Sequence, residues 1–240
     1  QGDDAGEADL SGRHHTIGYV NDIGIRTTCY AWMLYHLEHM ANKEVIEANT
    51  AVVSETTRCL LESIDVLLEQ TAEHYQCAKE AIRAICRADR RLALEVARKL
   101  NTVSRREDAF VAIAHHIVDN DDYNEGVGEI YECIEKVQDA RRRENLIVSV
   151  LDKICKRLKG RGVAPVAPRL LVLWKSSKLS YRRLQSCILS YEILILTQSV
   201  DYASTLSLLT EAEQRWGDIH VPWLKTDVAF WVITKLAPYD

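Results

Sequence analysis

Apolar residues recur along this chain with the spacing of α-helices, and the same spacing returns after a fixed interval. One stripe has apolar side chains at positions i, i+3, i+4 and i+7, on one face of a helix: Ala93, Val96, Ala97 and Leu100. The same stripe stands 37 residues later, in Ile130, Cys133, Ile134 and Val137. A fixed shift of this kind indicates an internal repeat.

A second helix follows each of these stripes and repeats with the same shift. Its apolar positions are Phe110, Ile113, Ala114 and Ile117 in the first copy. They are Ile147, Val150, Leu151 and Ile154 in the next copy. The link between the helices repeats too, since Arg105, Arg106 and Glu107 correspond to Arg142, Arg143 and Glu144. The repeating unit is therefore a pair of helices.

Weaker copies extend the pattern in both directions. An upstream unit is indicated by Leu61, Ile64, Leu68, Ala78, Ala81, Ile82 and Ile85. A downstream unit is indicated by Leu170, Leu173, Trp174, Cys187, Tyr191 and Leu194. The last unit has one stripe in Leu209, Ala212 and Trp216 and another in Phe230, Ile233 and Ala237. We count about five helix pairs, starting near residues 58, 90, 123, 167 and 202.

The predicted fold is all-α, a superhelix or solenoid of about five helical hairpins, because one pair cannot bury its apolar stripe alone and stacked pairs can. An amphipathic helix over Ile23 to Asn42 caps the stack. The helical-repeat domain spans residues 21–240, after a polar tail over 1–20 that we expect to be disordered. The segment 159–168, with two glycines and two prolines, is either a hinge or a long connection.

Composition narrows the function classes. The net charge of −5 and the pI of about 5.9 weaken the case for nucleic acid, and no apolar run is long enough for a membrane span. The seven cysteines form no C-x-x-C pair, so a reducing cytoplasm is the simplest setting. Because the chain begins at Gln1 and not at Met, we expect either a piece cut from a longer protein or a chain from which a tag was trimmed. In the first case a catalytic domain could lie outside this sequence.

Candidate metal ligands occur as two side chains one helical turn apart, with no third ligand on the same helical face. His115 and His116 have Asp119 one turn away. The other pairs are His36 with His39 and His74 with Cys77. Zinc sites require three or four protein ligands, and no nucleophile elbow or P-loop is present. We therefore expect no metal, no cofactor and no enzyme activity, with a metal-dependent helical enzyme as an alternative.

Arginine clusters and tryptophans each allow two interpretations. The clusters are Arg141 to Arg143, Arg105 with Arg106, and Arg182 with Arg183. They either bind phosphate or an acidic peptide, or pair with neighbouring carboxylates such as Glu107 and Glu144. Three of the five tryptophans lie in the last unit, where they either fill the core or form an exposed docking surface.

A helix–turn–helix unit near 34 residues resembles the tetratricopeptide class of α-solenoids, over roughly residues 58–240. The resemblance is one of architecture, since no unit has that family's W-x2-L-G-x2-Y start. It implies a concave groove, lined largely by first helices, that holds a peptide or a partner helix. Exposed first-helix positions beside the buried stripes are our predicted groove residues: Arg98, Tyr131, Glu135 and Lys175.

The main hypothesis is therefore a cytoplasmic, non-enzymatic scaffold or recognition module for a protein or peptide partner. The alternative is a regulatory or sensor domain of a larger prokaryotic signalling or defence enzyme, an NTPase or a protease. A further alternative, RNA binding by the helical repeats, conflicts with the acidic pI.

Overall fold

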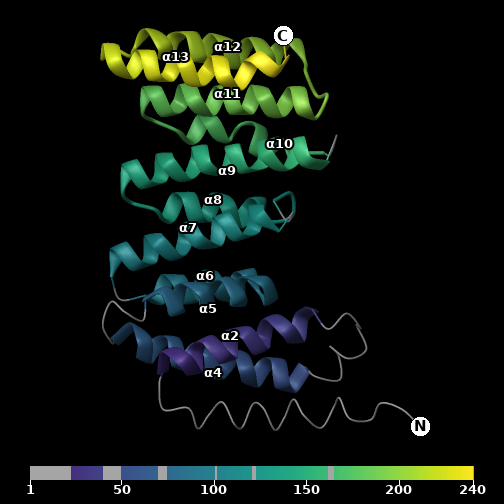
Figure 1. Ribbon diagram of the computed structural model, residues 1–240, viewed down its shortest axis with the longest axis vertical. Coiled ribbons are helices and arrows are strands. Elements are labelled where there is room, and N and C mark those ends of the chain that lie inside the picture. The colour runs from purple at the N-terminus through teal and green to yellow at the C-terminus, as the bar shows by residue number, and fades with distance from the viewer. Residues whose placement is uncertain are drawn as a thin grey trace, which may run out of the picture. The chain divides into compact units, whose positions relative to one another are not determined.

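The computed structural model describes residues 23–39, 50–69, 75–100, 102–120, 123–161 and 165–239, and all secondary structure in these ranges is helical (Figure 1). The predicted all-α class is therefore confirmed. The chain divides into two compact units, residues 1–116 and 117–240. The described helices contain no span long and apolar enough to cross a membrane. The predicted tail over 1–20 lies outside the described residues.

The first unit contains α2 (Ile23–His39), α4 (Thr50–Glu69), α5 (Tyr75–Ala88), α6 (Arg90–Lys99) and most of α7 (Val103–Asp119). Helix α2 packs against α4 and α5, and its bounds confirm the predicted helix from Ile23 up to His39, whereas its capping role stays a prediction. Helix α4 begins eight residues before the predicted start near 58. The side chains of Leu60, Ile82 and Ile85 are almost completely buried in this unit.

The second unit contains α8 (Val127–Lys136), α9 (Ala140–Arg161), α10 (Pro168–Leu171), the 3-10 helix η2 (Leu173–Ser176), α11 (Ser180–Leu196), α12 (Tyr202–Gly217), α13 (Pro222–Leu236) and the 3-10 helix η3 (Ala237–Tyr239). Helix α11 lies between α9 and the last pair, α12 and α13 (Figure 1). The predicted stripe of α9 is fully buried: Ile147, Val150, Leu151 and Ile154. Burying such side chains stabilises the fold by about 1.5–3 kcal/mol each.

The two best-matched copies start their second helices in the same way. The Thr102 hydroxyl accepts a hydrogen bond from the Arg105 N–H at 3.3 Å. The Asp139 carboxylate, 37 positions later, accepts one from the Arg142 N–H at 2.7 Å. Side chains of this type satisfy the backbone donors that a helix start leaves unpaired. The sequence repeat thus corresponds to a repeated cap.

Arginines at equivalent positions also make equivalent bonds. Arg106 donates to the carbonyl of Leu100 at 2.7 Å, and Arg183 donates to the carbonyl of Ser177 at 3.1 Å. Both bonds run from the first turn of a second helix to a carbonyl six residues earlier. The arginines therefore fasten a second helix to the end of the first, a role that the sequence did not indicate.

Glu144 differs from its predicted role as a partner of the neighbouring arginines. The side chain is buried, and its carboxylate accepts hydrogen bonds from the Ser177 hydroxyl and from the Lys178 N–H. The Lys178 bond is 2.7 Å long. Glu144 thus links the start of α9 to the connection between η2 and α11, which is a contact between segments far apart in sequence.

The last helix corrects one prediction. Phe230 and Ile233 were expected to form the buried stripe with Ala237, but they are 74% and 65% exposed. The buried apolar residue of α13 is instead Val228. The reason is that α13 carries apolar residues on both of its faces, so periodicity alone does not select the face that packs.

The segment 159–168 lies inside the second unit, and its end at residues 165–167 is bonded to the turn before α8. The Asn124 side chain donates to the carbonyl of Pro165 at 2.8 Å and accepts from the Ala167 N–H at 2.7 Å. The division between the two units lies elsewhere, between His116 and Ile117. The predicted hinge at 159–168 stays a prediction, and residues 162–164 lie outside the described ranges.

Candidate binding groove

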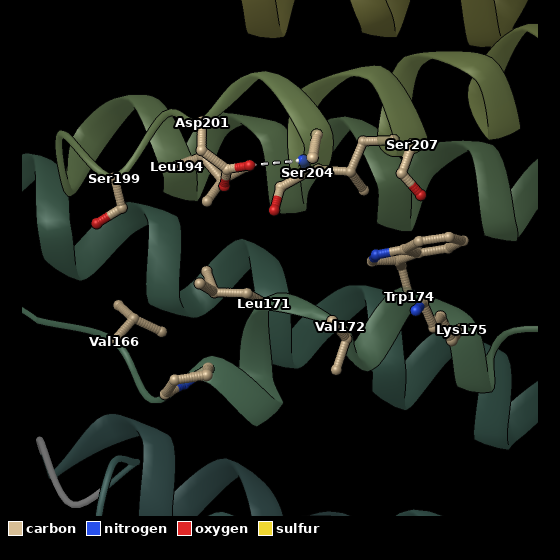
Figure 2. A pocket seen from close by; sticks show the side chains of 13 residues that line it. Val166, Leu171, Val172, Trp174, Lys175, Leu194, Ser199, Asp201, Ser204 and Ser207 are labelled. Atoms are coloured by element: carbon tan, nitrogen blue, oxygen red, sulfur yellow. Dashed lines mark hydrogen bonds between the residues drawn. The ribbon is translucent and has the colours of Figure 1, made fainter.

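A groove of about 570 Å³ opens in the second unit, between the α10–η2 segment and the first turns of α12 (Figure 2). Ligand sites in proteins commonly have volumes of about 300–1,000 Å³. Its lining consists of Val166, Pro168, Leu171, Val172, Trp174, Lys175, Leu194, Ser199, Asp201, Ala203, Ser204, Ser207 and Leu208. The floor is buried and apolar, whereas most of the rim is exposed to solvent.

One wall exists because the first helix of the fourth pair is interrupted. Pro168 stands at the start of α10, where its missing N–H costs nothing. The helix ends after Leu171, and the chain continues from Leu173 as a 3-10 helix. A continuous first helix was expected here, as in the second and third pairs. The interruption leaves Val172 exposed on the groove wall.

The opposite wall is positioned by the end of α11. The Ser199 N–H donates to the Leu194 carbonyl at 3.0 Å, and the Gln198 N–H donates to the Ile195 carbonyl at 3.1 Å. These two bonds form a Schellman motif, whose turn residue usually is glycine. Gln198 occupies the left-handed region with φ 54°. The turn directs the chain back so that α12 begins beside α10–η2 (Figure 2).

Trp174 forms the floor and is held by cations. The Arg183 guanidinium lies 5.2 Å from its ring centre, and the Lys175 ammonium lies 5.5 Å away. Cations at such distances are attracted to the face of an indole ring. Arg183 also pairs with Glu211 of α12 at 2.5 Å, and Glu211 pairs with Arg215 at 2.7 Å. This ion network ties α11 to α12 below the groove.

The rim offers one charge of each sign together with hydroxyl groups. Lys175 is exposed on the α10–η2 side. Asp201 caps α12 and accepts from the Ser204 N–H at 2.8 Å, and this backbone bond lowers the pKa of its carboxyl group. Figure 2 shows Ser204 and Ser207 on the face of α12 that looks toward the other wall. The rim can therefore pair with both acidic and basic groups of a ligand.

The four predicted groove residues have different surroundings. Lys175 lines the groove. Tyr131 is half-buried on α8, where its hydroxyl donates to the Arg169 carbonyl at 2.7 Å and its ring lies 4.8 Å from the Arg169 guanidinium. Glu135 is exposed on α8, and Arg98 is exposed on α6 of the first unit. Only Lys175 among the four lines this cavity.

The α12 side of the groove was missed from sequence. Asp201 and Tyr202 repeat the Asp-Tyr pair at Asp122 and Tyr123, and this repetition was the available signal. An aspartate that opens a helical pattern indicates an N-cap. It does not indicate which segment lies opposite, because that depends on the fold of α10–η2.

The histidine pairs gain no third ligand in the described part of the chain. No group of three or more histidine, cysteine, aspartate or glutamate side chains is arranged there to hold a metal ion. Lys153 lies 2.5 Å from the Asp119 carboxylate. The side chains of His36, His39 and Cys77, and all of His74, lie outside the described residues.

A second polar cluster surrounds Glu192, which is fully buried on α11. The Lys159 ammonium lies 2.6 Å from one carboxylate oxygen, and the Tyr239 hydroxyl donates to the same oxygen at 3.1 Å. Lys235 of α13 lies 4.0 Å from the other oxygen and 2.5 Å from Asp152 of α9. The cluster thus connects α9, α11, α13 and η3.

This cluster does not provide a nucleophile. Burial and the negative charge of Glu192 raise the pKa of the neighbouring Cys155 thiol well above its usual range. A reactive cysteine requires the opposite shift, because the thiolate is the nucleophile. Five other cysteines in the part of the chain that the structure describes are likewise not in disulfides: Cys29, Cys59, Cys86, Cys133 and Cys187. We interpret the cluster as a structural connection.

Buried thiols give this fold a predicted alkaline sensitivity. Burial raises the pKa of Cys187 to about 12, against 9.0 for an unperturbed thiol. A raised folded-state pKa stabilises the fold below pH 9, and this contribution is lost as pH rises toward 12. Between pH 8 and pH 10 the wild type should lose about 1.4 kcal/mol of unfolding free energy more than Cys187→Ala. Urea unfolding at both pH values measures this, with Cys29→Ala as control. Equal losses in wild type and Cys187→Ala would contradict the prediction.

Comparison of the chain with protein-family models, curated proteins and solved structures gave no match. The function is therefore inferred from the geometry and chemistry of the chain's own residues.

Proposed function

We propose that this chain is a non-enzymatic recognition module that binds an extended peptide of a protein partner in the groove between α10–η2 and α12. The supporting observation is an open groove with a buried apolar floor and a polar, exposed rim. Peptide-binding grooves combine apolar pockets, which take side chains, with polar groups that fix the backbone. Repeated helix pairs with equivalent caps support an α-solenoid of the tetratricopeptide-like kind as the scaffold.

The groups that line the groove indicate which peptide sequence it would prefer. Leu171 and Val172 offer apolar contact to one side chain of the peptide, and the hydroxyls of Ser204 and Ser207 offer hydrogen bonds to its backbone (Figure 2). Lys175 favours an acidic group toward the η2 side, and Asp201 favours a basic group beside the start of α12. The preferred sequence is therefore an apolar residue between an acidic and a basic one.

A second candidate function is that of a ligand-sensing regulatory domain of a larger enzyme. A groove of about 570 Å³ also suits a small molecule. The exposed rim favours the peptide, because small-molecule sites enclose most of the ligand surface.

The test is selection from a displayed library of random peptides, followed by affinity measurement for the selected sequence. Replacing Ser207 by tryptophan fills the groove from the α12 side, so we expect the selected peptide to bind at least about ten-fold more weakly, a loss of about 1.4 kcal/mol. Fluorescence anisotropy of a labelled peptide measures the dissociation constant.

The matched control is Gln214→Trp, which places the same side chain at an exposed position of α12 outside the groove lining. We expect its affinity to remain within about two-fold of the wild type, since surface changes away from a site have small effects. Equal weakening by both variants, or by neither, would show that the peptide binds elsewhere. Selection of no peptide would favour the small-molecule function.

A further inference from the structure

Both helices of the last pair expose apolar side chains that do not line the groove. Helix α12 exposes Tyr202, Leu206 and Leu209, spaced i, i+4 and i+7. Helix α13 exposes Trp223, Phe230 and Ile233, spaced i, i+7 and i+10. We call these six residues the outer face. Helical spacing makes each set a stripe rather than scattered surface residues.

The outer face lies away from the core to which both helices contribute. Leu208 and Ala212 of α12 and Val228 of α13 are buried in one cluster with α11, and Trp231 packs against it. At 100° per residue, Phe230 and Ile233 lie on the side of α13 opposite to Val228. The α13 stripe therefore faces solvent.

Each of the two stripes includes an exposed acidic residue. Asp227 lies within the α13 stripe, four residues after Trp223, and Glu213 continues the α12 stripe four residues after Leu209. Both are exposed. Neither carboxylate pairs with a cation among the residues that the structure describes.

The cations of the two helices are all engaged elsewhere. Arg215 pairs with Asp218 at 2.9 Å, in addition to Glu211. Lys225 lies 5.1 Å from the ring centre of Trp216, and Lys235 pairs with Asp152. The stripes therefore carry acidic charge and no basic charge of their own.

We propose that the outer face docks an amphipathic helix of a protein partner whose apolar stripe is flanked by lysine or arginine. An apolar face recognises a helix through residues at i, i+3, i+4 and i+7. The acidic groups select basic flanks, because complementary charges determine specificity at an interface. A second copy of this chain fits less well, since an isologous contact would bring Glu213 and Asp227 together with the same carboxylates of the other copy. The site is independent of the groove and involves different residues.

The test uses two designed helical peptides of about 18 residues with the same leucine stripe, one flanked by lysines and the other by glutamates. Fluorescence anisotropy of each labelled peptide is measured with the whole chain. We expect the lysine peptide to bind at least about ten-fold more tightly than the glutamate peptide. Phe230→Glu should weaken binding of the lysine peptide at least about ten-fold, and Asp227→Lys should reduce its preference over the glutamate peptide.

Matched controls separate the outer face from general attraction to an acidic protein. Glu95→Lys makes the same charge change on α6, and Val200→Glu adds the same charge at an exposed apolar residue outside the stripes. Both should bind the lysine peptide as the wild type does, and so should the groove variant Ser207→Trp. Equal binding of the two peptides, binding of neither, or equal loss in Asp227→Lys and Glu95→Lys would overturn the proposal. A dimer in sedimentation analysis that Phe230→Glu dissociates would overturn it as well, by assigning the face to a second copy.

Discussion

Replacing Glu192 by alanine should lower the free energy of unfolding by about 3 kcal/mol, toward the lower end of the range for a buried ion pair that loses one partner. The carboxylate is fully buried and receives Lys159, Lys235 and Tyr239 from three other elements. Its removal leaves these groups facing an emptied site. The loss stays near the lower end because Lys159 is 41% exposed and regains water.

Urea unfolding followed by circular dichroism measures this loss. Glu213→Ala, at an exposed glutamate of α12, is the matched control and should change the free energy by less than about 0.5 kcal/mol. The double variant Glu192→Met with Lys159→Met should be more stable than Glu192→Ala, because it removes the cation that loses its closest carboxylate and fills the emptied site with apolar atoms. If the single variant were as stable as the control, Glu192 would not connect the helices as described.

Truncating Leu151 to alanine should cost about 2–5 kcal/mol, whereas truncating the larger Phe230 should cost less than about 0.5 kcal/mol. Leu151 has no exposed surface in the α9 stripe, and Phe230 is 74% exposed on the outer face. A buried side chain loses its transfer free energy and leaves a cavity, but an exposed one leaves neither. The contrast reverses the order that side-chain size alone would give.

Thermal and urea unfolding of the two variants decide between burial and exposure. Circular dichroism of both should retain the helical spectrum of the wild type at low temperature. A loss of 2 kcal/mol or more in Phe230→Ala would contradict the exposed placement of α13's stripe. Such a loss would indicate instead that Phe230, Ile233 and Ala237 form a buried stripe, as periodicity predicted.

Local periodicity was enough to predict the helix pairs of the middle of the chain. The stripes at Ala93 to Leu100 and at Ile147 to Ile154 are buried as expected, because apolar residues on a single face leave one way to pack. For the last helix, α13, the stripe predicted from periodicity was wrong. Trp223 and Val228 lie on different faces of α13, and only the contact with α11 decides which one is buried.

The groove depends on contacts that no local pattern encodes. Lys175 was predicted as a groove residue from its exposed position beside a buried stripe, and it lines the cavity. Ser207 and Asp201 were not predicted, because they reach the groove only when the Gln198 turn places α12 opposite α10–η2. The long-range contacts of Glu144 and Glu192 were missed for the same reason, since their partners Ser177 and Tyr239 lie 33 and 47 residues away.

The central claim is that a peptide lies in the groove between α10–η2 and α12. A photo-crosslinking amino acid at position 207, compared with the same residue at position 214, tests it most directly with the selected peptide. Mass spectrometry then identifies the covalent product. The proposed function predicts a peptide adduct from position 207 and none from position 214. Adducts of equal yield from both positions, or from position 214 alone, would contradict it.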